Sequence, residues 1–213
     1  MRLYLASTSP ARLQTLRAAG VEPITMAPGV DEEAAVAARE QVTGPLSPAE
    51  MVQLLARAKA EALVGSSPDG EPIDGFILGG DSAFVVDGKI HGKPHTADVA
   101  KARWLAQNGA HGDLWSGHWL IDHRGGRVRG AVGRADVATV RFAALDEVEI
   151  DAYIASGEPL LVAGAFTIDS LGGPFIRRVE GDPSTVVGLS LSTLRDLVRE
   201  LGGDWPAFWN RLD

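Results

Sequence analysis

The chain lacks cysteine, and it has no long apolar run. The absence of cysteine excludes disulfides, thiolate metal ligands and cysteine nucleophiles, and it agrees with a reducing compartment. No segment approaches the roughly 18 consecutive apolar residues that cross a bilayer. The few apolar residues before Ser7 are too short for the core of a signal peptide. We therefore expect a soluble cytoplasmic protein with no membrane partner.

Positive charge is also scarce. Lysine and arginine number 20 against 28 acidic residues, which gives a formal net charge of −8. This balance opposes non-specific binding to nucleic acid, so no nucleic-acid partner is expected. If the ligand is a polyphosphate, its cationic contacts must be few and local. The 213 residues, 45% of them hydrophobic, suffice for a buried core.

Several common chemical motifs are missing. The sequence contains no Walker A motif, no Gly-x-Gly-x-x-Gly fingerprint after a strand and no His-Glu-x-x-His. Its histidines are scattered, so no histidine metal site is expected. The chemistry must come from carboxylates, hydroxyls and a few cations.

Strand-like and helical patterns alternate along the whole chain, which predicts an α/β class. A strand over 3–6 leads to Ser9-Pro10, which cap and open a helix. A second helix begins at Ser47 with a capping box and carries Lys59 near its end. A short buried strand over 76–78 would place Asp81 at a strand end. The remaining expected elements are a hairpin at 87–88, helices over 96–107, 146–157 and 192–201, and strands over 114–122, 136–142, 163–168 and 175–179.

The segment from Ser7 to Arg12 lies where the first strand meets its helix. Free backbone N–H groups and the helix dipole at such a junction favour a phosphate, and Arg12 adds a charged fork. A capped helix without a ligand explains the same residues. From the motif alone, the capped helix without a ligand is the favoured interpretation.

Carboxylates occur in two suggestive places. Asp31, Glu32 and Glu33 are expected on a loop, and Asp81 follows a buried strand. Magnesium takes hard oxygen ligands, usually one or two carboxylates together with phosphate oxygens, so a pair drawn from these segments would suffice. An acidic triplet on a loop is more often a solvated surface. Asp81 differs because an unpaired charge near the core is costly.

Two lysines complete the set. Lys93 stands between Gly92 and Pro94, in a loop expected near Asp81 if the hairpin forms. A lysine facing a carboxylate from a stiff turn suits a phosphate or a leaving group. Lys59 either joins this site or lies on the solvated face of its helix.

With these residues assembled, the sequence resembles the Maf family of nucleoside triphosphate pyrophosphatases over essentially the whole chain. Its Ser116-Gly117-His118 and 166–169 forms look like the actinobacterial branch. The segments that carry the resemblance are Leu5-Ala6-Ser7-Thr8-Ser9-Pro10, Val30-Asp31-Glu32, Gly80-Asp81-Ser82, His91-Gly92-Lys93-Pro94, Ser116-Gly117-His118, 162–166, Gly181-Asp182 and Val187-Gly188-Leu189.

The resemblance implies a single domain over 1–213, with a mixed twisted sheet flanked by helices and a nucleotide cleft between two lobes, often as a homodimer. It implies house-cleaning hydrolysis of a nucleoside triphosphate to the monophosphate and pyrophosphate, with Mg²⁺ or Mn²⁺ as cofactor. Asp81, Glu32 and Lys93 would be catalytic, and Glu32 and Asp81 would hold the metal. The implied substrate contacts are Ser7, Ser9, Arg12, Lys59, Ser82 and Asp169.

The chain departs from the family pattern at three positions linked to base preference. Ala11 stands where arginine is usual, Ser82 where threonine is common and Asp169 where glutamine is usual. A carboxylate only accepts hydrogen bonds, whereas an amide also donates, so a different base edge is read. The lost arginine and the change to Asp169 keep open a nucleotide-binding regulator of cell division without turnover, although the retained Asp81, Glu32 and Lys93 argue against it. A second alternative is an inosine-triphosphatase-like enzyme for deaminated purines. A purely structural role leaves Gly80-Asp81 and Gly92-Lys93-Pro94 unexplained.

Overall fold

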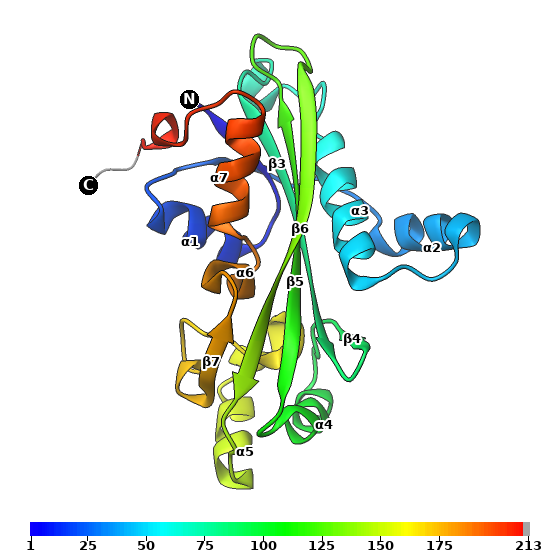
Figure 1. Ribbon diagram of the computed structural model, residues 1–213, viewed down its shortest axis with the longest axis vertical. Helices are drawn as coiled ribbons and strands as arrows, with labels where there is room; N and C mark the ends of the chain where they lie inside the picture. Colours follow the sequence, from blue (N-terminus) through cyan, green and yellow to red (C-terminus); the bar gives the residue numbers. More distant parts are fainter. Residues whose placement is uncertain (211–213) are drawn as a thin grey trace.

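The fold is built on one seven-stranded mixed sheet (Figure 1). The computed structural model describes residues 1–210. The strand order is β2-β1-β3-β5-β6-β7, and β4 pairs with β3 outside this path. Strand β1 pairs in parallel with β2 and β3, and the remaining pairs are antiparallel. The strands are β1 (Leu3–Ala6), β2 (Ile24–Met26), β3 (Phe76–Val86), β4 (Lys89–His91), β5 (His111–Asp122), β6 (Gly130–Phe142) and β7 (Ile176–Glu180). The mixed sheet of the expected α/β fold is thus confirmed.

Helices cover both faces of this sheet. Figure 1 shows α3 on one side of β3 and β5, with α1, α6 and α7 on the other, and α2 projecting away beside α3. The α-helices are α1 (Pro10–Ala18), α2 (Glu32–Thr43), α3 (Pro48–Glu61), α4 (Ala97–Gln107), α5 (Glu147–Ala155), α6 (Pro183–Val187) and α7 (Leu191–Glu200). The short 3₁₀ turns are η1 (Pro68–Gly70), η2 (Glu158–Leu161), η3 (Ala163–Ala165), η4 (Gly173–Phe175) and η5 (Trp205–Phe208). No helix within residues 1–210 combines the length and apolarity that a bilayer crossing requires.

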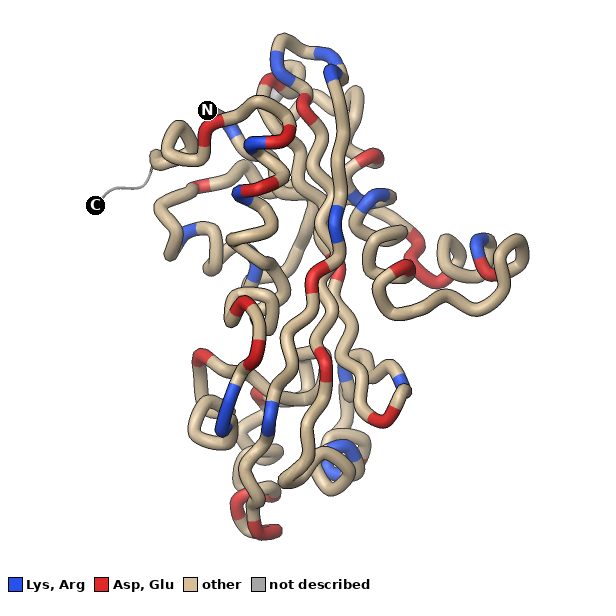
Figure 2. The backbone as a smooth tube through the Cα atoms, in the orientation of Figure 1, with Lys and Arg blue, Asp and Glu red and all other residues tan. Residues whose placement is uncertain are grey.

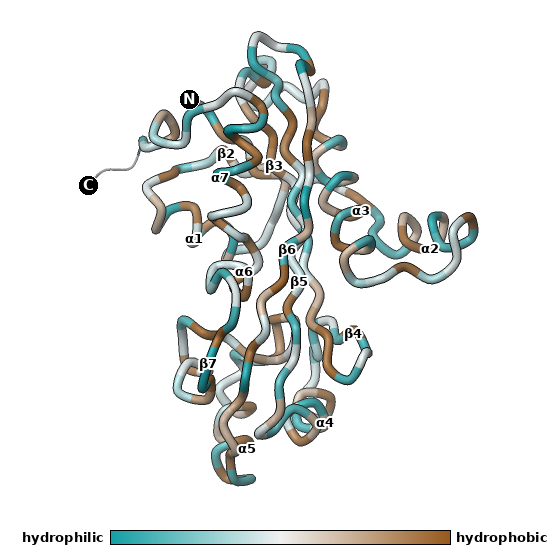
Figure 3. Tube along the Cα trace, in the orientation of Figure 1, coloured by the Kyte–Doolittle hydropathy of each residue, from teal (hydrophilic) through white to brown (hydrophobic). Residues whose placement is uncertain are grey.

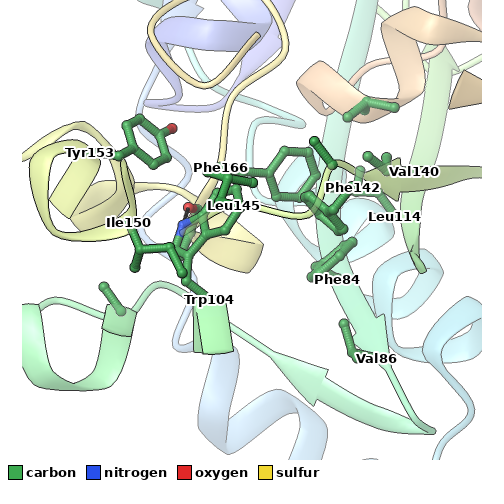
Figure 4. Close-up of a cluster of buried hydrophobic side chains, with 14 of the residues drawn as sticks. Phe84, Val86, Trp104, Leu114, Val140, Phe142, Leu145, Ile150, Tyr153 and Phe166 are labelled. Atoms are coloured by element: carbon green, nitrogen blue, oxygen red, sulfur yellow. Dashed lines mark hydrogen bonds between the residues drawn. The ribbon is translucent and has the colours of Figure 1, made fainter. Parts of the chain in front are cut away.

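Apolar cores occupy the two ends of the long strands. At one end, aliphatic side chains of β1, β3 and α7 pack around Phe76 and Phe208. At the other end, Phe84, Trp104, Phe142 and Phe166 form edge-to-face ring contacts (Figure 4). Figure 3 shows hydrophilic segments where the long strands pass between these ends. The sheet therefore has a polar middle between two apolar cores.

The middle of the sheet is polar because the antiparallel register of β3 and β5 lines up their polar residues. Ser82 lies opposite Ser116, and Gly80 lies opposite His118. We call Asp81, Ser82, Ser116 and His118 the polar waist. Asp81 is in the middle of the eleven-residue strand β3, so its expected position at a strand end was wrong.

The two glycines before Asp81 explain why the strand was expected to end there. A Cβ atom on Gly79 would lie 2.0 Å from the backbone oxygen of Ala56, and one on Gly80 would lie 3.1 Å from Arg12 Nε. The two glycines are therefore needed for the close approach of α3 and Arg12 to the strand, and they do not end it.

Two further local expectations were wrong. Residues 31–33 do not form a loop, because Asp31 caps α2 by accepting a hydrogen bond from Ala34 N, and Glu32 and Glu33 lie in its first turn. No strand forms over 163–168, where Gly164 and Ala165 have φ values of 75° and 61°. Those values are incompatible with an extended strand. The capped helices at Ser9, Ser47 and Asp146, the 87–88 hairpin turn and the strand near 176 are confirmed.

Candidate active site

A buried lysine joins two carboxylates beside the polar waist. Lys59 Nζ lies 2.7 Å from Asp81 Oδ1 and 2.8 Å from Glu32 Oε1. The side chains of Lys59 and Asp81 are 9% and 10% exposed, whereas that of Glu32 is 50% exposed. The cluster therefore opens to solvent on the Glu32 side. Helix α3 presents Lys59 from its last turn, where the helix dipole favours a cation.

The environment of Asp81 makes it easier to protonate than an ordinary aspartate. Burial raises the pKa of its carboxyl group, and the charges of Lys59 and Arg12 oppose this shift. Its Oδ1 accepts from Lys59, whereas Oδ2 has no hydrogen-bond partner in the described part of the chain. One carboxylate oxygen is thus held and the other is available to a ligand or a water.

Arg12 lies at the junction of three segments that are far apart in the sequence. Its guanidinium donates to Ser7 Oγ at 3.2 Å, Ser82 Oγ at 2.9 Å and the Gly188 carbonyl at 2.8 Å. Burial lowers the pKa of Arg12, and the charges of Asp81 and Glu32 oppose that shift. A guanidinium group remains charged in proteins. Arg12 therefore places a cation beside the carboxylates at the start of α1.

The expected α1 junction forms with its hydroxyls in place. Ser9 caps the helix by accepting from Arg12 N at 3.4 Å, and Ser9 N donates to Ser7 Oγ at 3.1 Å. The first turn of α1 contains no acidic residue. A helix start of this kind attracts an anion through its free N–H groups and its dipole.

Sequence reasoning missed the polar support behind this junction. Ser116 Oγ lies 3.1 Å from Ser82 Oγ and donates to the Thr185 carbonyl at 3.0 Å. The Ser116-Gly117-His118 segment was recognised as a family motif without a role. The register of β3 and β5 gives Ser116 and His118 their position, and a sequence alone does not supply that register.

His118 is neutral, and its hydrogen bonds fix a single tautomer of the ring. Ser190 N donates to its Nε2 at 2.8 Å, so Nδ1 carries the proton and donates to the Arg134 carbonyl at 3.2 Å. Burial lowers the pKa of His118 to about 4, although the Arg134 carbonyl opposes the shift. The imidazole therefore fixes the segment between α6 and α7, which carries the Gly188 partner of Arg12.

Two expected site residues lie outside the cluster. Lys93 is exposed in the loop after β4, and its side chain makes no hydrogen bond or ion pair with residues 1–210. Asp169 is exposed on the loop before η4, where it lines an open pocket of about 310 Å³ with Gln14, Thr15, Ala18, Ala19 and Leu191. The pocket borders later turns of the same helix whose start holds Ser9 and Arg12. Figure 2 shows lysine and arginine spread along the backbone, in agreement with a small number of local cationic contacts.

The carboxylates suit a divalent cation only in part. Glu32 and Asp81 already converge on one cation, the Lys59 ammonium, so their oxygens fit a hard metal ion. Among the described residues, no three His, Asp or Glu side chains are grouped closely enough to hold a metal ion. The remaining ligands would have to come from phosphate and water, which is the usual arrangement for magnesium.

Comparison with known proteins assigns the chain to a family. A model of the Maf-like protein family matches residues 2–201. The chain belongs to this family. The Maf-like protein is 70% identical over 211 residues to a nucleoside triphosphate pyrophosphatase of Leifsonia xyli, with 99% of this chain and 98% of the relative covered. It is 46% identical to a protein of the same name from Nocardia farcinica, with 97% and 96% covered. It is 44% identical to one from Corynebacterium diphtheriae, with 99% of each chain covered.

Proposed function

We propose that this Maf-like protein hydrolyses a nucleoside triphosphate to the monophosphate and pyrophosphate. The observation that carries the proposal is the Lys59 ammonium shared by Asp81 and Glu32, next to the positively polarised start of α1. The names of the relatives support the same activity. The site combines a partly exposed acid, a buried carboxylate and buried cations within one cluster, as polyphosphate hydrolysis requires.

The triphosphate would bind over the start of α1. Ser7, Ser9 and Arg12 are proposed to contact phosphate oxygens. Ser82 would hold Arg12 in place by accepting a hydrogen bond from its guanidinium. Lys59 would bind the phosphates from the α3 side. Lys93, which is exposed and unpaired within the described residues, would reach the pyrophosphate leaving group.

In the proposed reaction, a water attacks the α-phosphorus in line with the leaving group. Asp81 accepts the proton of this water on its unpartnered Oδ2. The bond from the α-phosphorus to the bridging oxygen breaks, and its electron pair leaves with pyrophosphate. Arg12 and the lysines stabilise the charge that develops on the phosphoryl oxygens and the leaving group.

A divalent ion is proposed as the cofactor, and Glu32 and Asp81 would hold it together with phosphate oxygens. When bound, Mg²⁺ or Mn²⁺ would neutralise phosphate charge and polarise the phosphoryl group. Glu32 suits this role because its side chain is half exposed and reaches the cluster from the first turn of α2.

Asp169 is proposed to contact the base. It lines the pocket beside later turns of α1, whose lining residues Gln14 to Ala18 lie about 3–9 Å along the helix from Arg12 at 1.5 Å per residue. A carboxylate accepts hydrogen bonds only, so Asp169 would favour a base edge that donates N–H.

The test is product analysis with a panel of canonical and modified nucleoside triphosphates, with magnesium or manganese, for the wild type and Asp81→Asn. We expect equimolar monophosphate and pyrophosphate from the wild type with metal, and almost none from Asp81→Asn. Binding of nucleotides without turnover by the wild type would contradict the proposal and favour the regulator.

A further inference from the structure

One carboxylate outside the cluster gathers the donors of the loop that carries Asp169. Glu158, the first residue of η2, accepts from the hydroxyls of Tyr153 at 2.9 Å, Thr167 at 2.5 Å and Ser170 at 2.6 Å. It also accepts from Leu171 N at 3.2 Å and Gly172 N at 3.0 Å. Four of these five donors belong to residues 167–172.

These bonds hold the loop on both sides of Asp169. Thr167 lies two residues before Asp169, and Ser170 directly follows it. Thr167 also donates from its backbone N to Tyr153 Oη at 3.2 Å, and Gly172 N bonds Thr167 Oγ1 at 3.3 Å. The loop is therefore closed on itself around one carboxylate, and Asp169 stands at its exposed turn.

The opposite end of this network rests on the apolar core. The Tyr153 ring packs edge-to-face against Trp104, with ring centroids 5.5 Å apart. Figure 4 shows the Tyr153 ring at the border of the aromatic cluster. A Cβ atom on Gly172 would lie 2.5 Å from Tyr153 Oη, so the loop approaches the ring too closely for any other residue. Core packing thus reaches the loop through Tyr153 and Glu158.

The carboxylate stays ionised in this position. Burial raises the pKa of Glu158, but hydrogen bonds from Ser170, Thr167, Tyr153 and the Leu171 backbone outweigh it and lower the pKa to about 2. Both oxygens are acceptors at neutral pH, and each has at least two donors. An amide in the same place would offer one acceptor and would present a donor to the Leu171 N–H.

We propose that Glu158 is a positioning residue for base selection, because it holds the 167–172 loop in the conformation that presents Asp169 to the nucleobase. This inference rests on the proposed function, since it takes the ligand of the Asp169 pocket to be the base of a nucleotide. Glu158 itself does not touch the substrate. Loss of its carboxylate lets Asp169 move, so the difference in affinity between bases shrinks while the phosphate site at the start of α1 is untouched.

The experiment compares the wild type with Glu158→Gln and with a matched control, Glu149→Gln. Glu149 is an exposed residue of α5 whose carboxylate accepts from Asp146 N, and glutamine serves equally at that capping position. Nucleotide Kd values are measured across the base panel in EDTA, where turnover is absent, and pyrophosphate release is measured separately with metal. The two readouts keep binding selectivity apart from hydrolysis.

We expect Glu158→Gln to reduce the ratio of Kd values between the weakest-binding and tightest-binding base by about tenfold. This factor corresponds to the loss of one charge-assisted hydrogen bond. Glu149→Gln should keep the wild-type ratio. Amide hydrogen exchange at Leu171 and Gly172 should become faster only in Glu158→Gln. Should Glu158→Gln not fold, Ser170→Ala removes one donor at an exposed position and should lower the ratio by a smaller factor.

A folded Glu158→Gln with the wild-type Kd ratio would overturn the inference, as would a uniform loss of affinity for every base. A wild type that binds all bases equally, or binds none, would overturn it as well. Absence of pyrophosphate release, with base-selective binding intact, would instead overturn the proposed function alone.

Discussion

The polar waist and the apolar ends of the sheet are built from opposite kinds of side chain. At the ends, residues such as Leu197 and Trp104 are almost fully buried and contribute through apolar burial. At the waist, Asp81 and His118 are also buried, yet burying polar and charged groups is costly unless they are paired. On the proposed function, we expect the apolar ends to contribute mainly stability and the waist to contribute the chemistry. Changes at the ends should therefore lower stability and leave activity near the wild-type value, whereas changes at the waist should lower activity most.

The largest expected effect is the loss of activity in Asp81→Asn. The amide cannot accept the proton of the attacking water, so kcat should fall by about 10²- to 10⁴-fold. The Tm should also fall, because the buried Lys59 ammonium loses its buried charged partner and keeps only the half-exposed Glu32. Steady-state pyrophosphate release and thermal unfolding test this together. Asp151→Asn, at an exposed partner of Lys101, is the control that should keep both values.

The converse variant lies at an apolar end. Leu197→Ala removes a side chain of α7 that is 1% exposed, and it should lower the free energy of unfolding by about 2–5 kcal/mol. Below its Tm the variant should retain kcat near the wild-type value. Urea unfolding measures the loss, and Leu105→Ala, at a position that is 53% exposed, should cost far less. Equal losses for the two leucines would contradict the assignment of stability to this core.

Protonation of His118 in the waist should destabilise the protein in mild acid. The pKa of His118 falls from 6.5 to about 4 on burial, so the unfolded chain binds more protons between these values. Stability is therefore full above pH 6.5 and falls as the pH decreases toward 4, by up to about 3 kcal/mol. Chemical unfolding across this range measures the slope. His118→Gln keeps an acceptor for Ser190 N and should flatten it, and an unchanged slope would show that another group titrates.

A second window at lower pH belongs to carboxylates outside the waist. Hydrogen bonds to Glu158 and Asp182 outweigh the effect of burial and lower both pKa values to about 2. Their contribution is present above their ordinary pKa values of 4.5 and 3.8, and it is lost as the pH falls toward 2. Unfolding of Glu158→Gln should therefore lose part of its pH dependence below 4.5 only. A change above pH 5 in that variant would contradict this assignment.

The smallest effect is expected at Asp169, which belongs to neither region. The Asp169 carboxylate only accepts hydrogen bonds, and Asp169→Gln adds an N–H donor at this position. The ratio of kcat/KM values between bases should therefore change by about tenfold. Its Tm should stay near the wild-type value because the side chain is exposed. Identical ratios in the variant and the wild type would exclude Asp169 as a base contact.

Local signals in the sequence were sufficient for much of the fold. The caps at Ser9, Ser47 and Asp146 mark helix starts through bonds that span only a few residues. Helix α2 was missed because it has no buried residue and thus no clear apolar face. Gly79 and Gly80 were interpreted as the end of a strand. These positions require glycine because α3 and Arg12 approach the strand closely there.

The candidate site was predicted in its residue types and less well in its connections. Asp81 was singled out by its expected burial, whereas the roles of Glu32 and Lys59 came from the family resemblance, and a solvated helix face remained an alternative for Lys59. The bond from Arg12 to Gly188 spans 176 positions, and that from Ser190 to His118 spans 72. No local pattern encodes such pairs, so the support behind Arg12 and the Glu158 network required the folded chain.

The central claim is that the waist directs water to the α-phosphorus of a nucleoside triphosphate. The most direct measurement is hydrolysis of the best substrate in ¹⁸O-labelled water, with mass analysis of both products. We predict that the label enters the monophosphate alone and that Asp81→Asn abolishes its incorporation. Label in pyrophosphate, or release of labelled orthophosphate, would contradict the account.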